Sequence, residues 1–409
     1  MVDAAQIFLK QRFVASSLVI LLLSSCKLRV VVPEGGTVES KSTTYSCASG
    51  QTCEINVVDL FFDESFVAKP ASGYKFKFWK KGDKRFCGHK KTACNLSTSG
   101  HDPSVTEVIS NFLSTEEVFY LQHVFECSQP LTTTANVGAD NDVDTPTSTA
   151  AELLYVGDFE TGEFQERSAG RDAWSVYSQG IEDAIVVETA LARKGKHASK
   201  FKLEKDDWNG NSSIQGEGKP RAQLVKDNKT LPINFDSDYW LGLSTYMPND
   251  WKADTNESNA EVLWQFHASG GVGPYVPPLA LIVRGEVLEI ESHFGDVQSQ
   301  IGTRVHWSCG VQTGEWVDWV VNVRFSLEEG MIRVWRNGEK IVNFSSGPTM
   351  FYDSENLERK PLYIGIGLYK PKYVKIPSSV TKRTMYFDEV RVATGGSDGK
   401  GLVTPGVSN

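Results

Sequence analysis

The 409-residue chain carries 42 Lys and Arg against 51 Asp and Glu, which gives a formal net charge of −9 at neutral pH. This acidic balance argues against a protein that coats nucleic acid through general positive charge, although a local basic groove for an acidic polymer remains compatible with it. The chain has 10 Trp, 13 Tyr and 35 Gly and few helical periodicities. Such a composition favours a β-rich protein with aromatic surfaces, as is common among sugar-binding proteins.

The first 25 residues have the pattern of a secretory signal. A positive flank precedes an apolar run at residues 13–23, which is too short for a stable membrane span. The run ends in Leu-Ser-Ser-Cys26, which resembles the bacterial lipobox. The resemblance implies that residues 1–25 are a lipoprotein signal peptide and that Cys26 receives the lipid; an ordinary signal peptide is the alternative. Because Lys27 and not Asp follows, the same rules imply an exported outer-membrane lipoprotein, either periplasmic or at the cell surface.

Cysteines predict a disulfide-stapled module at residues 28–127. Five of the six cysteines after Cys26 fall between residues 47 and 127, as expected for an exported protein with structural disulfides. The preferred local pairs are Cys47 with Cys53 and Cys87 with Cys94. Sequence does not prove this connectivity, and it leaves open whether Cys127 pairs with Cys309.

The same module shows strand signals. Residues 30–38 read as strand, turn and strand, and residues 73–79 alternate aromatic and basic side chains at a period of two. With the cysteines, these features resemble the small β-rich repeat modules, related to the internalin B-repeat, of bacterial surface proteins. That resemblance implies a spacer or adhesion role.

The composition changes twice after the module. Residues 128–152 are rich in Thr, Ala, Asp and Pro, which predicts a flexible linker that lets the next domain move. Residues 153–394 contain many short strands separated by turns, with a clear hairpin signal at residues 336–339. No strand–helix alternation appears, so we expect an all-β chain with a C-terminal β-jelly-roll (concanavalin A-like) sandwich. Residues 395–409 are expected to form a flexible tail.

Three stretches of the predicted sandwich place polar side chains on one strand face. In the stretch Trp-Gln-Phe-His at residues 264–267, the period of two puts the amide and the imidazole together, with the two aromatics on the core face. In residues 363–369, Tyr, Gly, Gly and Tyr alternate with core Ile and Leu, and the glycines leave room for a bulky ligand. The side chains expected on the open face are Arg221, Gln223, Gln265, His267, Tyr363 and Tyr369.

These stretches occur as Arg-x-x-Leu, Gln-x-His and Tyr-x-x-x-Gly-x-Tyr, in that order. They resemble the motifs of jelly-roll polysaccharide lyases, a group that includes alginate lyases and, as related sandwiches, glucuronan lyase and heparin lyase I. A Gly-x-Trp at residues 314–316 and a Trp-x-Asn-Gly hairpin at residues 335–338 fit the same resemblance. Gln223 stands where alginate lyases usually carry Glu, and Gly365 is also unusual; both departures bear on alginate as the substrate more than on the lyase class.

The resemblance implies β-elimination on a uronic acid polymer. The C5 proton becomes acidic enough only when the neighbouring carboxylate is neutralised, a role that suits Arg221 and Gln265. His267 titrates near neutrality and suits the base, while Tyr369 suits the acid that protonates the leaving oxygen. Tyr369 acting as both base and acid is the alternative. Further substrate contacts are expected from Gln223, Tyr363 and Lys370.

We expect no cofactor in this chemistry. The resemblance does imply a structural Ca²⁺ held by Glu160 and Asp388, near the first and last strands of the sandwich. The expected partners are an acidic polysaccharide and a membrane, the latter through the lipid anchor, with no nucleic acid. The chain is expected to be a monomer.

Two other functions remain open from the sequence. A sandwich-type glycoside hydrolase needs two carboxylates on one face, and Glu289 and Glu291 alternate along one strand. A non-catalytic glycan-binding or adhesion lipoprotein would use Arg221 and the aromatic side chains to hold glycan without cleaving it.

Overall fold

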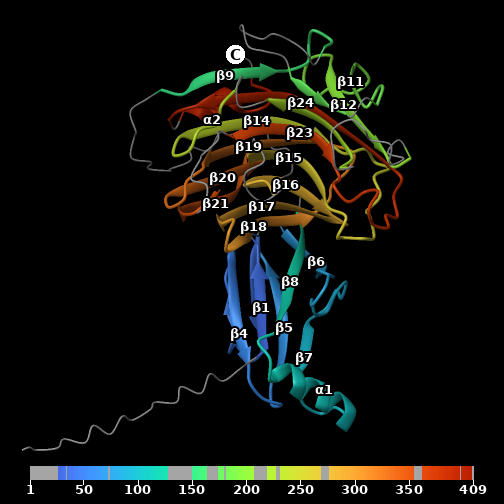
Figure 1. Ribbon diagram of the computed structural model, residues 1–409, viewed down its shortest axis with the longest axis vertical. Coiled ribbons are helices and arrows are strands. Elements are labelled where there is room, and N and C mark those ends of the chain that lie inside the picture. The colour runs from blue at the N-terminus through green and yellow to red at the C-terminus, as the bar shows by residue number, and fades with distance from the viewer. Residues whose placement is uncertain are drawn as a thin grey trace, which may run out of the picture.

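The computed structural model describes residues 26–33, 35–71, 74–127, 150–163, 174–178, 181–206, 219–226, 231–268, 276–353, 362–396 and 398–407. The predicted signal peptide and residues 128–149 of the predicted linker lie outside the described residues. The described chain forms a small β module below a larger β-sandwich (Figure 1). The expected nearly all-β class and the jelly-roll-type sandwich are confirmed. Neither helix among the described residues has the length and apolarity needed to cross a bilayer.

The N-terminal module consists of two four-stranded sheets and one helix. The first sheet runs in the order β4 (Gln51–Val57), β1 (Cys26–Val32), β8 (Val118–Cys127) and β6 (Tyr74–Trp79). The second runs in the order β3 (Ser46–Cys47), β2 (Gly36–Ser40), β5 (Asp63–Pro70) and β7 (Cys94–Ser97). Alternate residues of β1, Leu28, Val30 and Val32, are buried, so one face of the first sheet forms part of the module core.

Helix α1 (Pro103–Leu113) connects the two sheets of the module. It begins where the side chain of Asp102 accepts the backbone N–H groups of Ser104 and Val105, and Pro103 occupies the first turn. Both features are favoured at helix N-termini, because the cap satisfies free N–H groups and proline has none to satisfy.

The two predicted local disulfides, Cys47–Cys53 and Cys87–Cys94, are confirmed. Cys309 is also disulfide-bonded, and the side chain of Cys127 lies outside the described residues.

Among the described residues, the sandwich consists of two eight-stranded sheets. The site sheet runs in the order β10 (Ser175–Tyr177), β13 (Arg221–Lys226), β23 (Leu362–Tyr369), β15 (Glu261–Ala268), β16 (Leu279–Arg284), β17 (Val287–Asp296) and β18 (Gln300–Gly310), with β22 (Phe351–Tyr352) beside β17. The back sheet runs in the order β11 (Ile185–Glu188), β12 (Ala198–Glu204), β24 (Lys382–Thr394), β14 (Asp238–Tyr246), β19 (Trp316–Arg324), β20 (Gly330–Arg336) and β21 (Glu339–Gly347), with β9 (Glu152–Gly157) beside β24. Large side chains such as Trp264, Phe266 and Trp319 fill the core between the sheets.

The predicted hairpin joins β20 to β21. Asn337 and Gly338 both have positive φ, 49° and 83°, as a two-residue turn of this kind requires.

The predicted flexible tail differs from the structure, because residues 398–407 pack on the back sheet. Helix α2 (Gly399–Val403) buries Val403 in a cluster with Trp240 and Trp335. Gly399 lies so close that an added Cβ would be 2.3 Å from the Trp240 ring. Two apolar residues in a short polar segment were enough to dock it. The segment has no periodic pattern from which the docking could be predicted.

The module and the sandwich also pack directly against each other, which differs from the independent motion expected from a flexible linker. Strands β6 and β8 lie against β17 and β18 (Figure 1). Phe78, Val124 and Val287 form a shared apolar cluster, and Lys80 forms a buried ion pair with Glu289. A second polar contact is the hydrogen bond from Trp307 to the Tyr74 hydroxyl at 3.2 Å.

Candidate active site

Strands β13, β23 and β15 are neighbours in the site sheet, so the three motifs predicted from the sequence lie side by side. Arg221 pairs with Tyr369 across β13 and β23. On the other side of β23, His267 pairs with Tyr363 and Gln265 pairs with Gly365. Residues nearly 150 positions apart in sequence therefore share one face, which lies opposite the core side chains Trp264 and Phe266.

Arg221 and Tyr369 form a stacked pair at one end of this face. The guanidinium carbon lies 4.2 Å from the Tyr369 ring centroid, within the range of a cation–π interaction. The buried Nε of Arg221 has no hydrogen-bond partner among the described residues. Because a guanidinium is always charged and offers several donors, Arg221 is available for an anionic ligand.

His267 and Tyr363 stack farther along the same face, with ring centroids 5.3 Å apart and planes 19° apart. Arg221 and Tyr369 both act electrostatically on the Tyr363 hydroxyl, so the two pairs border one site. The Nδ1 of His267 lies 2.8 Å from the carbonyl oxygen of Ala268. A carbonyl oxygen only accepts, so Nδ1 carries the hydrogen and Nε2 of the neutral ring has a free lone pair. Burial lowers the pKa of His267, with a further lowering from the nearby charge of Arg221. Burial raises the pKa of Tyr363 to about 12.

Two buried amides, Gln223 and Gln265, line the floor between these pairs. A Cβ added to Gly365 would lie 3.5 Å from Gln265 and 3.7 Å from Gln223, so this glycine sits between the two side chains. Both polar atoms of Gln223 and the Oε1 of Gln265 are buried without a hydrogen-bond partner among the described residues. Because such groups normally find partners, the floor is suited to bind a polar ligand.

Gly367 does not open the face in the way that the sequence suggested. It has a φ of 124°, and an added Cβ would lie only 2.3 Å from the carbonyl oxygen of Ala222. It faces the register shift between Val262 and Trp264 in β15. Glycine is required here because the backbone bends, not because a ligand needs space.

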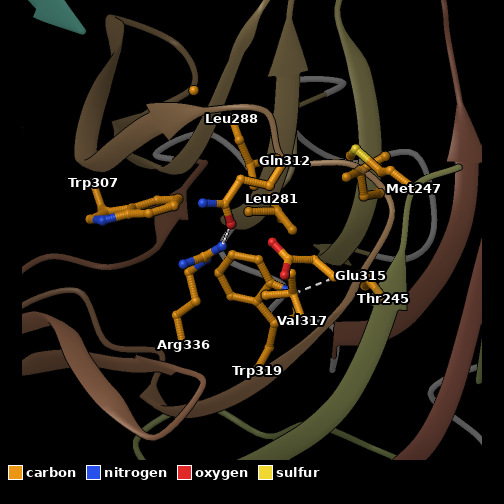
Figure 2. Close-up of a pocket in the computed structure, with 12 residues that line it drawn as sticks. Thr245, Met247, Leu281, Leu288, Trp307, Gln312, Glu315, Val317, Trp319 and Arg336 are labelled. Atoms are coloured by element: carbon orange, nitrogen blue, oxygen red, sulfur yellow. Dashed lines mark hydrogen bonds between the residues drawn. The ribbon is translucent and has the colours of Figure 1, made fainter. Parts of the chain in front are cut away.

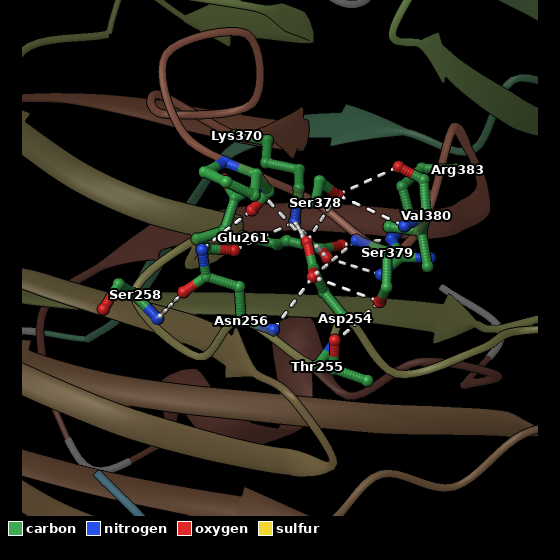
Figure 3. Close-up of polar contacts among 12 residues, drawn as sticks. Asp254, Thr255, Asn256, Ser258, Glu261, Lys370, Ser378, Ser379, Val380 and Arg383 are labelled. Atoms are coloured by element: carbon green, nitrogen blue, oxygen red, sulfur yellow. Dashed lines mark hydrogen bonds and ion pairs between the residues drawn. The ribbon is translucent and has the colours of Figure 1, made fainter.

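The structure contradicts the predicted substrate contact of Lys370. Its side chain is 1 % exposed, and its Nζ lies 2.9 Å from Asp254 and 2.8 Å from Glu261 (Figure 3). It also donates to the carbonyl oxygen of Asn259 at 2.9 Å. The Lys370 ammonium is buried and already paired inside the protein, so it is not available to bind a polymer.

Lys370 belongs instead to a buried polar cluster that fixes the loop after β23. Figure 3 shows Arg383 donating to Glu261 and the two serines 378 and 379 donating to Asp254. Burial disfavours the charge of Asp254, but hydrogen bonds from Ser378 and Lys370 outweigh it and hold the pKa of that carboxyl well below its usual range. Because Lys370 directly follows Tyr369, the cluster also holds the end of β23 that carries the tyrosine.

Replacing Lys370 by Met is expected to lower the free energy of unfolding by about 3–5 kcal/mol, because Asp254 would lose its buried cationic partner. Urea denaturation of the purified protein measures the change. Lys372→Met is the matched control, since Lys372 is exposed in the same loop and its replacement should alter stability by no more than about 0.5 kcal/mol. Equal effects of the two substitutions would contradict the role given to the cluster.

The structure also contradicts the pair of hydrolytic carboxylates considered from the sequence. Glu289 is 0 % exposed and forms ion pairs with Lys80 of the module and, at 3.3 Å, with Arg284. Glu291 pairs with Arg284 at 2.8 Å. The cations that surround Glu289 lower its pKa, although burial acts in the opposite direction. A glycosidase needs one protonated carboxyl and access to the sugar, and Glu289 offers neither.

Glu160 and Asp388, the predicted calcium ligands, hold backbone amides of one loop. Glu160 accepts from Lys196 and His197, and Asp388 accepts from Arg193 and Lys194. Burial raises the pKa of Asp388 to about 7. Their oxygens are engaged by N–H donors, and no cluster of three or more potential metal ligands occurs in the described part of the chain. These contacts give both acids a role in holding the loop, and the calcium site stays a prediction.

A small cavity lies between the two sheets (Figure 2). Trp307, Trp319 and Leu281 form part of its wall, and Arg336 donates to Gln312 across it (Figure 2). None of the predicted site residues lines this cavity. The face of β13, β23 and β15 that lies opposite the core carries the polar groups without hydrogen-bond partners among the described residues, and it is the candidate site.

Sequence reasoning left out two residues near this site. Tyr177 pairs with Gln223 at the edge of the site sheet and is 41 % exposed. His293 lies near enough to His267 to contribute to the lowering of its pKa, and its Nδ1 lies 2.7 Å from the carbonyl oxygen of Pro277. The period-two series 289, 291 and 293 along β17 would have placed His293 on the same face.

Comparison with known proteins identifies the family. The model of the family described as "Polysaccharide lyase" matches residues 159–391, which is more than half of the chain. The chain belongs to this polysaccharide lyase family. The match spans almost the whole sandwich and includes all three motifs. As a polysaccharide lyase, the protein is an enzyme that breaks carbon–oxygen bonds of a polysaccharide by elimination.

Solved structures similar to this polysaccharide lyase include an endo-β-1,4-glucuronan lyase from the fungus Trichoderma reesei, at 16 % identity and a TM-score of 0.47, covering 63 % of this chain and 100 % of that one. A family 7 alginate lyase, A1-II′, in complex with product has 12 % identity and a TM-score of 0.37, covering 53 % and 85 %. A GH131 β-glucanase catalytic domain from Podospora anserina has 11 % identity and a TM-score of 0.39, covering 59 % and 95 %. No curated protein matches the chain.

Proposed function

We propose that this polysaccharide lyase cleaves a uronic-acid-containing polysaccharide on the open face of β13, β23 and β15. The observation that carries the proposal is the set of polar groups with unused hydrogen-bonding capacity on that face. Arg221 supplies a cation with a free donor, and Gln223 and Gln265 supply buried amides without partners among the described residues. An anionic sugar with several hydroxyls is the class of ligand that satisfies both kinds of group.

In the proposed reaction, Arg221 and Gln265 bind the uronate carboxylate and stabilise the enediolate that forms when C5 is deprotonated. His267 takes the C5 proton through Nε2, which has the free lone pair in the neutral ring. The electron pair of that C–H bond then forms the C4=C5 double bond as the C4–O bond breaks. Tyr369 gives its hydroxyl proton to the departing oxygen, so the products are an unsaturated uronate end and a free hydroxyl.

The assignment of His267 as base predicts the acidic limb of the pH profile. The base must be neutral, so kcat/KM reaches its maximum at pH values above the pKa of His267. It decreases as the pH falls through that pKa. Since that pKa is lowered, the limb should lie below the ordinary value of about 6.5. Lys219→Met removes one of the charges that lower this pKa and should move the limb to higher pH. Lys372→Met should leave it in place, and a limb at or above the ordinary value would contradict the assignment.

A substrate screen tests the proposed function directly. The purified chain is incubated with alginate, glucuronan, ulvan and heparin, and both ultraviolet absorbance and reducing ends are followed. We expect at least one polyuronate to yield ultraviolet-absorbing unsaturated ends in proportion to reducing ends. Reducing ends without that absorbance would indicate a hydrolase. Tight binding without cleavage, unchanged in His267→Ala, would indicate a glycan-binding protein.

We also propose that the enzyme is an exported lipoprotein attached to a bacterial outer membrane through Cys26. Cys26 begins β1 and is the free cysteine among the described residues. The lipobox-like sequence before it supports the proposal. Replacing Cys26 by Ser is expected to release active, soluble lyase into the periplasm or the medium, as cell fractionation would show. Retention of Cys26→Ser in the membrane fraction would contradict attachment through this residue.

A further inference from the structure

The end of the module that lies farthest from the sandwich exposes several large apolar side chains. On α1 these are Val105, Val108 and Phe112, which are 41 %, 54 % and 44 % exposed. In the loop between β4 and β5, Val58 is 60 % and Phe61 is 85 % exposed. We call these five residues the distal surface. Contiguous exposed apolar side chains on a small domain generally mark an interaction site.

Helix α1 shows most clearly that the module covers these apolar side chains only in part: Phe112 packs edge-to-face on Phe119, with ring centroids 5.6 Å apart, yet stays 44 % exposed. The positions 105, 108, 109, 112 and 113 are apolar, which is the spacing of one helix face. Ile109 and Leu113 are half-buried on the side toward the module, yet none of the helix residues is fully buried. An amphipathic helix is normally stabilised when its apolar face is covered. The exposed apolar residues of α1 are therefore expected to bind a partner.

Strand register places this surface at the end of the module where the chain enters. Cys26 pairs with Val57, which is followed by the β4–β5 loop, and Lys27 pairs with Val118, the first residue of β8 after α1. The loop is tied to the segment that leads into α1, because Phe62 and Thr98 exchange hydrogen bonds of 2.8 and 3.0 Å. Figure 1 shows α1 and the start of β1 together at the end opposite the sandwich.

The chain outside the described residues indicates what covers this surface. The apolar run at residues 13–23 ends three positions before Cys26, so the most apolar segment of the sequence leads directly to this end of the module. In the proposed lipoprotein, a lipid on Cys26 replaces that segment, so the chain enters the module from the membrane. A bilayer is therefore the partner that the entry point of the chain brings next to the distal surface.

We propose that the distal surface binds the surface of a phospholipid bilayer, with Phe61 and Phe112 inserted at the boundary between headgroups and acyl chains. This inference rests on the proposed membrane attachment through Cys26, which it extends with a second contact. A single acyl chain gives only marginal attachment, and stable anchoring takes two signals. The distal surface supplies the second signal.

The charges around the distal surface select the type of lipid. Asp59, Asp102 and Glu107 are exposed on the same loop and helix. An acidic rim disfavours anionic headgroups, so the attraction comes from apolar insertion and not from charge. Binding to zwitterionic vesicles should therefore be insensitive to salt, whereas binding through basic patches is weakened by screening.

The test uses a chain that begins at residue 26 and carries Cys26→Ser, which keeps every described element but has no lipid. Co-sedimentation with vesicles of phosphatidylcholine and phosphatidylethanolamine gives the partition coefficient at low and high salt. We expect Phe61→Ser with Phe112→Ser to lower this coefficient by at least about tenfold at both salt concentrations. The matched control is Tyr352→Ser with Val407→Ser, since both residues are exposed apolar positions on the sandwich, each 42 % exposed; it should bind as the parent does.

Three results would overturn the inference. One is equal partition of the parent and the Phe61, Phe112 variant. Another is parent binding that disappears at high salt. The third is failure of the parent to bind vesicles while it forms dimers that the variant does not form, as measured by sedimentation velocity. The mass of residue 26 in the native membrane-bound protein is measured separately. Absence of a lipid there would refute attachment through Cys26. The vesicle experiment would still test membrane binding by the distal surface.

Discussion

Replacing Tyr369 by Phe is expected to lower kcat for elimination by about 10²–10⁴-fold, because the departing oxygen would lose its proton donor. Phenylalanine keeps the ring on which the Arg221 guanidinium stacks at 4.2 Å, so binding of the uronate should change little. The substitution thus separates proton transfer from the shape of the site. Ultraviolet-detected kinetics on the preferred polymer give kcat and KM for both proteins.

The control for this substitution is Tyr352→Phe, which removes a hydroxyl from an exposed tyrosine in β22, away from the motif strands. It should leave kcat unchanged. If Tyr369→Phe kept full kcat, Tyr369 would not be the acid. If Tyr369→Phe lost activity while His267→Ala kept it, Tyr369 would serve as both base and acid.

The second large effect is expected at the interface between the module and the sandwich. Glu289→Ala leaves the buried Lys80 without its carboxylate partner and should lower the free energy of unfolding by about 3–5 kcal/mol. Urea denaturation followed by tryptophan fluorescence measures this loss. Because the ion pair joins the two units, the variant should also begin to unfold in two separate transitions.

A neighbouring ion pair in the same interface provides the control. Lys77 and Glu286 lie 3.6 Å apart, but the Glu286 side chain is 56 % exposed, so Glu286→Ala should cost no more than about 1 kcal/mol. The double variant Lys80→Met with Glu289→Met removes both buried charges and should recover most of the stability lost in Glu289→Ala. Similar losses for Glu286→Ala and Glu289→Ala would show that burial of the Lys80–Glu289 pair has no special weight.

Local pattern was sufficient to predict the face that carries the candidate site. The alternation of Gln265 and His267 with Trp264 and Phe266 already fixes which side chains share a side of β15, because successive strand residues point in opposite directions. The order of strands was not available from the pattern. The structure supplies it, because Arg221 pairs with Tyr369 and His267 pairs with Tyr363 on the two sides of β23.

The errors concern residues whose environment depends on distant parts of the chain. Lys370 was expected at an exposed rim, but Asp254 and Glu261, more than 100 positions earlier, enclose it. Glu289 and Glu291 were correctly placed on one strand, yet Lys80 lies 209 positions away from Glu289. Neither periodicity nor composition reports a contact of that kind. A charged residue on the predicted open face was therefore easily mistaken for one that meets solvent.

In the proposed membrane-attached enzyme, the docking of β6 and β8 against β17 determines the distance between the active face and the membrane. A free linker would let the sandwich move in all directions around the module. Here the buried ion pair and the apolar cluster hold the sandwich at a fixed position on the module. Strand β8 alone, with ten residues, spans about 34 Å at the usual rise. An anchored lyase built this way would digest polymer only in a thin layer at that height, and its rate would depend on how densely polymer fills the layer.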